Sequence, residues 1–275
     1  MEIQWSSYLK VHFPALSEIY LDTHAEKEIN EQLVTRNSEL LKVCPDKYTT
    51  TFYDLFVRII NTEIENDREQ EISRSLLGQL NDNVERLNNI LIQNKLSISQ
   101  VKNYLDGLFR VNGEKYLDKV GELLSTNYIL ENNNNFKLLQ LEYKHEPHLG
   151  NKSKDSDLLI FDEVLKGGIL VDILNVNLDH EKIEDEIGLT KILSHRIGNK
   201  YIDKRYHKIQ INDSFKIGVI QPFIWVYDLC SILKYEEVFR NFTIYNSLPI
   251  LLLRQKSNGQ GQVYYDCIQA KDINS

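Results

Sequence analysis

Two acidic residues stand inside segments that otherwise have the composition of buried strands. Asp157 begins the apolar run DLLIF, and Asp172 lies between Val171 and Ile173 in the run ILVDILNV. Burying an ionised carboxylate without a partner is strongly unfavourable. Two close carboxylates also repel each other unless one is protonated, a basic residue intervenes or a divalent cation binds between them. The pair therefore predicts a site that holds positive charge.

Each acid also has an interpretation without a metal. In that case Asp157 accepts backbone N–H groups at the start of its strand, and Asp172 forms a salt bridge with a neighbouring Lys or Arg. An acid among apolar strand residues is still a candidate for a functional site, because carboxylates with perturbed pKa values are concentrated at such sites. Sequence alone leaves both interpretations open.

The elements around the two acids are a mixture of helices and strands. Residues 113–228 predict the order helix, strand, strand, strand, helix, strand. The expected helices cover 114–130 and 189–208, and the expected strands cover 136–146, 157–161, 169–177 and 216–227. A further helix is expected over 229–239, with strands over 242–253 and 261–270. Both faces of the 169–177 strand are largely apolar, so it is expected to be a central strand covered on two sides.

The preceding part of the chain, residues 1–112, predicts a separate helical region, and residues 113–275 predict an α/β domain. Helices are expected over 25–43, 48–64 and 67–95. In the last of these, apolar residues recur at intervals of three or four, which is typical of one face of an amphipathic helix. These positions are Ile72, Leu76, Leu80, Val84, Leu87 and Leu91. Helical pattern alone assigns no chemistry to this region.

The expected helix over 189–208 is basic, although the whole chain has a net charge of −8. Arg196, Lys200, Lys204 and Lys208 recur at every fourth residue and are expected to form one cationic stripe. Like charges at this spacing destabilise a helix, and a polyanion would relieve the repulsion. The stripe therefore predicts contacts with nucleic-acid phosphates. A solvated helix face is the alternative.

Taken together, this arrangement resembles the PD-(D/E)xK nuclease superfamily over about residues 113–228. The resemblance implies an α/β fold with a restriction-endonuclease-like mixed sheet flanked by helices. In that family the two strand acids bind Mg²⁺, which activates water to attack a phosphodiester. Asp157 and Asp172 match these acids, and Glu122, or less favourably Glu114, resembles the family's helix glutamate. Glu146 is expected to approach the metal from the end of its strand.

The sequence departs from the family at one important position. The family has a Lys two residues after the second acid, where this chain has Leu174. Without that cation the developing charge on the phosphate loses a stabilising group. Lys191, near the start of the basic helix, and Lys144, on the first strand, are the candidates to replace it. Inactive members of the superfamily also occur.

The leading hypothesis is a nuclease that cleaves DNA or RNA with Mg²⁺ or Mn²⁺, with a role in bacterial defence inferred from the family. The alternative is a catalytically inactive nuclease-like protein that binds nucleic acid or a protein partner. No secretory signal is recognised at the start of the sequence, and no apolar stretch reaches the roughly 18 to 20 residues that span a bilayer. The three widely spaced cysteines suit a reducing compartment. A cytoplasmic protein without a membrane partner is therefore expected.

Overall fold

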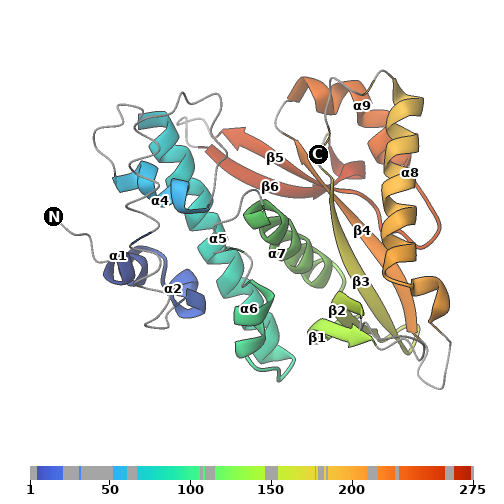
Figure 1. Ribbon diagram of the computed structural model, residues 1–275, viewed down its shortest axis with the longest axis horizontal. Coiled ribbons are helices and arrows are strands. Elements are labelled where there is room, and N and C mark those ends of the chain that lie inside the picture. The colour runs from blue at the N-terminus through green and yellow to red at the C-terminus, as the bar shows by residue number, and fades with distance from the viewer. Residues whose placement is uncertain are drawn as a thin grey trace. The chain divides into compact units, whose positions relative to one another are not determined.

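The computed structural model describes most of the chain (Figure 1). The described residues are 5–20, 31, 52–60, 67–105, 108, 115–145, 154–176, 178, 183, 185–209, 216–226, 229–257 and 263–273. The chain divides into two compact units. The first unit comprises 1–89, 101–123 and 256–265, and the second comprises 90–100, 124–255 and 266–275. The predicted domain boundary between residues 112 and 113 stays a prediction.

Helices make up most of the described part of the first unit. They are α1 (Trp5–His12), α2 (Pro14–Tyr20), α4 (Phe52–Ile60), most of α5 (Asp67–Gln93), most of α6 (Ser99–Tyr104) and the first half of α7 (Lys115–Glu131). Along α5, Leu76, Leu80, Val84 and Leu87 are buried. The predicted amphipathic helix over 67–95 is therefore confirmed. Of the predicted helix over 25–43 only residue 31 is described, so that helix stays a prediction.

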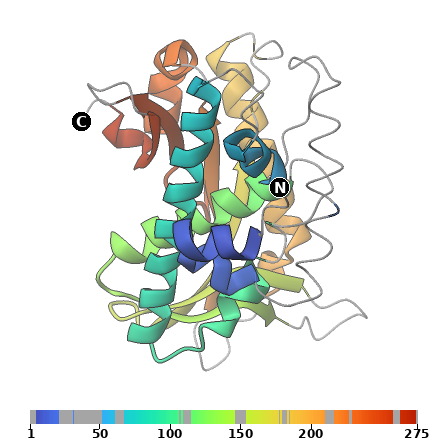
Figure 2. The same ribbon diagram turned by 90° about the vertical axis from the view of Figure 1, so that its left-hand side faces the viewer.

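Within this unit, a side chain of α5 caps the start of α2. The backbone N–H groups of Ala15 and Leu16 donate to Oδ1 of Asn81 at 2.9 and 3.3 Å. The first N–H groups of a helix have no intrahelical partner, and Pro14, at the first helical position, has no N–H to satisfy. Asn81 thus stabilises the start of α2, and the two helices lie side by side (Figure 2).

Six strands form one mixed sheet in the order β1-β2-β3-β4-β5-β6. They are β1 (Phe136–His145), β2 (Lys154–Asp162), β3 (Gly167–Val176), β4 (Lys216–Val226), β5 (Leu251–Ser257) and β6 (Val263–Gln269). The first three strands pair antiparallel, whereas β4 runs parallel to β3 and β5 runs parallel to β4. Parallel neighbours require a crossover connection, usually a helix. Helices α8 (Glu186–Asp203) and α9 (Leu229–Asn241) supply the two crossovers.

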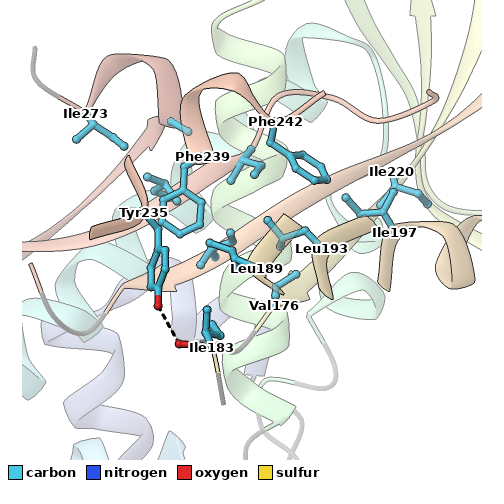
Figure 3. Close-up of a cluster of buried hydrophobic side chains, with 14 of the residues drawn as sticks. Val176, Ile183, Leu189, Leu193, Ile197, Ile220, Tyr235, Phe239, Phe242 and Ile273 are labelled. Atoms are coloured by element: carbon cyan, nitrogen blue, oxygen red, sulfur yellow. Dashed lines mark hydrogen bonds between the residues drawn. The ribbon is translucent and has the colours of Figure 1, made fainter. Parts of the chain in front are cut away.

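The main core of the second unit lies between the sheet and α8 (Figure 3). Asp185 caps α8 by accepting the N–H of Gly188 at 2.7 Å. Leu189, Leu193 and Ile197 of α8 are buried at intervals of four residues. They pack with residues of the sheet and of α9, namely Leu159, Leu170, Val176, Ile220, Ile224, Tyr235 and Phe239. This stripe confirms that α8 is amphipathic.

The predicted boundaries are wrong at two places. The basic helix was expected to reach residue 208, but α8 ends at Asp203 and a separate 3-10 turn, η4 (Tyr206–Lys208), follows. Arg205 has a φ of 57°, a left-handed conformation that does not continue a right-handed helix. The strand expected over 242–253 begins only at Leu251, because the preceding segment includes Asn246 with a φ of 60°.

The α/β class predicted from the sequence is confirmed in its coarse form: a six-stranded mixed sheet accompanied by several helices. Each of the four strands expected between residues 136 and 227 corresponds to an observed strand. Among the described residues, no helix combines the length and apolar character needed to cross a membrane.

Candidate functional site

Asp172 lies in β3 on the side of the sheet that faces α8. Leu170 and Val176 belong to the core around α8, and Asp172 shares their face because strand side chains alternate. The Asp172 side chain is fully buried, with 0% exposure. An acid at this position needs positive charge close by.

Two lysines provide that charge, Lys200 in the last turn of α8 and Lys204 at its C-cap. Lys200 Nζ lies 2.9 Å from Oδ1 of Asp172, and Lys204 Nζ forms a close ion pair with Oδ2. The two lysines are four residues apart, so they project from the same side of the helix end. Their side chains are 31% and 19% exposed, respectively. The site therefore extends from a buried carboxylate to partly exposed ammonium groups.

These ion pairs leave the carboxylate without directed hydrogen bonds. Within the described residues, neither Oδ1 nor Oδ2 of Asp172 accepts a hydrogen bond of regular geometry. The attraction therefore depends on charge and proximity. A buried carboxylate held in this way has acceptor lone pairs that a differently placed cation would satisfy.

Asp157 lies at the same end of the β2–β3 ladder. The last paired residues at that end are Leu158 and Val171, so Asp157 and Asp172 are the next residues along their strands. Oδ2 of Asp157 accepts the backbone N–H of Ile173 at 2.6 Å. The side chain thus satisfies a backbone donor beyond the end of the ladder. It also carries a second negative charge to the neighbourhood of Asp172.

Tyr206 of η4 packs against this pair. Its side chain is buried, and its hydroxyl donates to Oγ of Ser156 at 2.8 Å. Burial raises the pKa of the Tyr206 phenol well above its ordinary value, and the charges of Asp172 and Asp157 raise it further. Tyr206 therefore remains neutral.

Gly218 of β4 makes room for Tyr206. A Cβ atom at Gly218 would lie 2.2 Å from Cγ of the Tyr206 ring, which is far too close for two carbon atoms. The ring also meets Tyr201 of α8 edge-on, with centroids 5.6 Å apart. Sequence reasoning missed Tyr206, Ser156 and Gly218 as members of the site. An isolated glycine within an apolar strand was the available signal, because it often marks a close approach.

The four residues of the predicted cationic stripe differ in their positions and partners. Lys200 and Lys204 bind Asp172, whereas Arg196 is exposed on α8. Lys208 lies in η4, beyond the end of the helix. The prediction of one continuous helical stripe over these four residues is therefore wrong, because the backbone turns at Arg205.

The two lysines predicted to replace the missing strand cation lie elsewhere. Lys191 is exposed on α8, nine residues before Lys200, which corresponds to about 13 Å along a helix axis. Lys144 is exposed on β1 and lies opposite Asp155 in the strand register. In the described part of the chain, no ion pair joins either lysine to Asp172. Lys200 and Lys204 are instead the lysines that lie beside Asp172.

The additional predicted metal ligands are not brought to the two acids by the described structure. Glu122 belongs to the first compact unit and forms an ion pair with Lys119 at 2.6 Å. Glu146 and Glu114 lie outside the described residues. Among the residues that are described, no group of three or more His, Cys, Asp or Glu side chains is placed to hold a metal ion.

The donor set of Asp157 and Asp172 nevertheless fits Mg²⁺ in type. Mg²⁺ is usually bound through one or two carboxylates together with water and substrate phosphates, rather than by a cage of protein ligands. The unsatisfied acceptor geometry of Asp172 is consistent with such a ligand. Binding there requires at least one ammonium group to leave its carboxylate oxygen.

Comparison with known proteins adds no assignment, since no family model, curated protein or solved structure matches the chain. The function has to be inferred from the site.

Proposed function

We propose that this protein is a metal-dependent nuclease with a restriction-endonuclease-like fold, hydrolysing phosphodiester bonds in DNA or RNA. The observation that carries the proposal is the presence of two lysines beside the buried Asp172. They supply from α8 the positive charge that Leu174 cannot supply from β3. The family resemblance and this geometry point to the same chemistry.

The order of elements supports the fold assignment. Helix α7 is followed by β1, β2 and β3, then by α8 and β4. The acids lie on β2 and β3, and the basic helix follows them, as the resemblance implies. The strands form a mixed sheet, and α8 packs on β4.

Asp157 and Asp172 would hold Mg²⁺ or Mn²⁺ through carboxylate oxygens. When bound, such an ion lowers the pKa of a water molecule and so provides a nucleophile at neutral pH. Lys200 and Lys204 would place positive charge where a phosphodiester gains negative charge during hydrolysis. Tyr206 holds Ser156 and closes the inner side of the site.

Exposed cations on α8 would bind the nucleic-acid backbone. Arg196 and Lys191 are exposed on α8, and contacts of this type position a nucleic acid without reading its sequence. The choice between DNA and RNA, the cytoplasmic location and the role in bacterial defence stay predictions from the resemblance.

The test compares cleavage of plasmid DNA and of a structured RNA by the wild-type chain and by Asp172→Asn, each with Mg²⁺, Mn²⁺ or EDTA. The asparagine keeps the shape of the side chain and removes its charge. We expect cleavage by the wild type with either metal, at least 100-fold slower cleavage by Asp172→Asn, and none with EDTA. Equal rates for the two proteins would refute the assignment.

A catalytically inactive nuclease-like protein is the second candidate. Each oxygen of Asp172 faces an ammonium group, and one oxygen of Asp157 accepts a backbone N–H. Both acids are thus explained without a metal. This candidate predicts nucleic-acid binding that weakens steeply with salt, without cleavage in any divalent cation. A protein partner in place of nucleic acid is predicted if both binding and cleavage are absent.

A further inference from the structure

The ammonium groups of Lys200 and Lys204 occupy the positions that a metal bound to Asp172 would need. One ammonium group lies against each carboxylate oxygen, and the side chain of Asp172 has no exposed surface from which another cation could approach. A divalent ion and an ammonium group at the same oxygen repel each other strongly in a partly buried site. The lysines and the metal therefore compete for Asp172.

The two lysines differ in how firmly they are held. Lys204 is the less exposed of the two, donates to the backbone oxygen of Asp155 and is the residue at which the backbone caps α8. Lys200 has a side chain that is 31% exposed and lies on the regular part of the helix. Lys200 can move toward solvent without disturbing the end of α8.

We infer that Lys200 occupies the cation position on Asp172 in the metal-free protein, and that a divalent ion binds only by displacing it. This inference rests on the metal site of the proposed function. The released ammonium group is then available to a phosphate of the nucleic acid. Metal and nucleic acid thus favour each other's binding, as coupling between two ligands must be reciprocal.

Titration calorimetry with MnCl₂ tests the inference without measuring catalysis. The proteins are the wild type, Lys200→Met, Lys200→Arg and Lys166→Met. Methionine has a similar length and no charge, whereas arginine retains the charge. Lys166 is exposed in the turn at the other end of β2, so its substitution removes the same charge from a remote position.

We expect Lys200→Met to bind Mn²⁺ at least 10-fold more tightly than the wild type. Lys200→Arg is expected to bind no more tightly than the wild type, and Lys166→Met within about twofold of it, since exposed charges beyond about 10 Å are largely screened. Circular dichroism and thermal unfolding confirm that each variant is folded. If Lys200→Met does not fold, Lys200→Gln replaces it as the neutral variant, with the same expected affinity.

An unchanged Mn²⁺ affinity in the neutral variant, or the absence of saturable binding in all four proteins, would overturn the inference. The proposed function is judged separately by cleavage. If the wild type cleaves in a metal-dependent way but Lys200→Met binds Mn²⁺ with unchanged affinity, the proposed nuclease function stands and the competition between Lys200 and the metal is rejected. Tighter Mn²⁺ binding by Lys200→Met without cleavage by the wild type retains the competition and rejects the nuclease.

Discussion

The β2–β3 ladder has an aspartate of β2 at each end, Asp162 in the last pair on the turn side and Asp157 just beyond the other end, and the two acids have different partners. At the turn end, Oδ1 of Asp162 accepts the backbone N–H groups of Val164 and Leu165 at 2.8 and 3.1 Å. At the other end, Asp157 accepts one backbone N–H and lies beside Asp172, which is neutralised by lysines of α8. The first acid is satisfied by the next few residues of its own turn. The second acid belongs to a site assembled from separate elements.

This difference separates an acid that stabilises local structure from a pair of acids that concentrates charge. A turn aspartate bonds its own backbone within two or three residues, and such hydrogen bonds are worth about 1 kcal/mol each. Asp172 instead requires two cations brought in by a crossover helix. Burying three charges is not an efficient way to stabilise a fold, because hydrophobic residues of similar volume are often as good or better. The arrangement is therefore consistent with the proposed function.

The largest expected effect comes from breaking the charge cluster. We expect Asp172→Leu to lower the free energy of unfolding by about 3 to 5 kcal/mol, since it leaves two partly buried ammonium groups without their partner. Combining it with Lys200→Met and Lys204→Met is expected to restore most of that loss while cleavage stays absent. Urea unfolding measures both variants. If the triple variant is no more stable than Asp172→Leu, the unpaired ammonium groups are not the cause of the lost stability.

A matched pair of substitutions compares the two ends of the β2–β3 ladder directly. Asp157→Asn and Asp162→Asn each retain an oxygen acceptor for the backbone, so each is expected to cost roughly 1 kcal/mol or less. Cleavage is expected to fall at least 100-fold in Asp157→Asn, because the site loses a metal ligand, and to stay unchanged in Asp162→Asn. Parallel unfolding and cleavage assays measure the pair. Equal cleavage losses in both variants would remove the functional distinction between the two ends.

The smallest effect concerns Tyr206 and depends on pH. At pH 7 we expect Tyr206→Phe to be about 1 kcal/mol less stable than the wild type, because the hydrogen bond to Ser156 is lost. Burial and the two acids raise the pKa of Tyr206 in the folded protein. Its ordinary pKa is about 10, so above that pH the unfolded chain releases a proton that the folded protein retains. The wild type is thereby destabilised and the phenylalanine variant is not.

The stability difference between these two proteins should therefore shrink between about pH 10 and pH 11. Chemical unfolding at pH 7, 9, 10 and 11 measures it, and the remaining tyrosines cancel because both proteins contain them. A difference that stays constant over this range would mean that neither burial nor the two acids raise the pKa of Tyr206 in the folded protein.

Several features of the fold could be predicted from local patterns. The spacing of Leu76, Leu80 and Val84 predicts an α-helix, and all three are buried. The apolar runs around Asp157 and Asp172 predict adjacent strands, and β2 and β3 pair antiparallel. The end of α8 was mispredicted because the basic pattern continues past Arg205, where the backbone adopts a left-handed conformation.

Composition and periodicity by themselves predicted an α/β protein with an acid inside each of two neighbouring apolar strands. These properties depend on interactions between residues a few positions apart, which a linear pattern records. Only the tertiary structure decided that Lys200 and Lys204, rather than Lys191 or Lys144, neutralise Asp172. That choice depends on the angle and length of the crossover helix and on Tyr206 packing over Gly218. Such long-range packing has no signature in the spacing of the residues concerned.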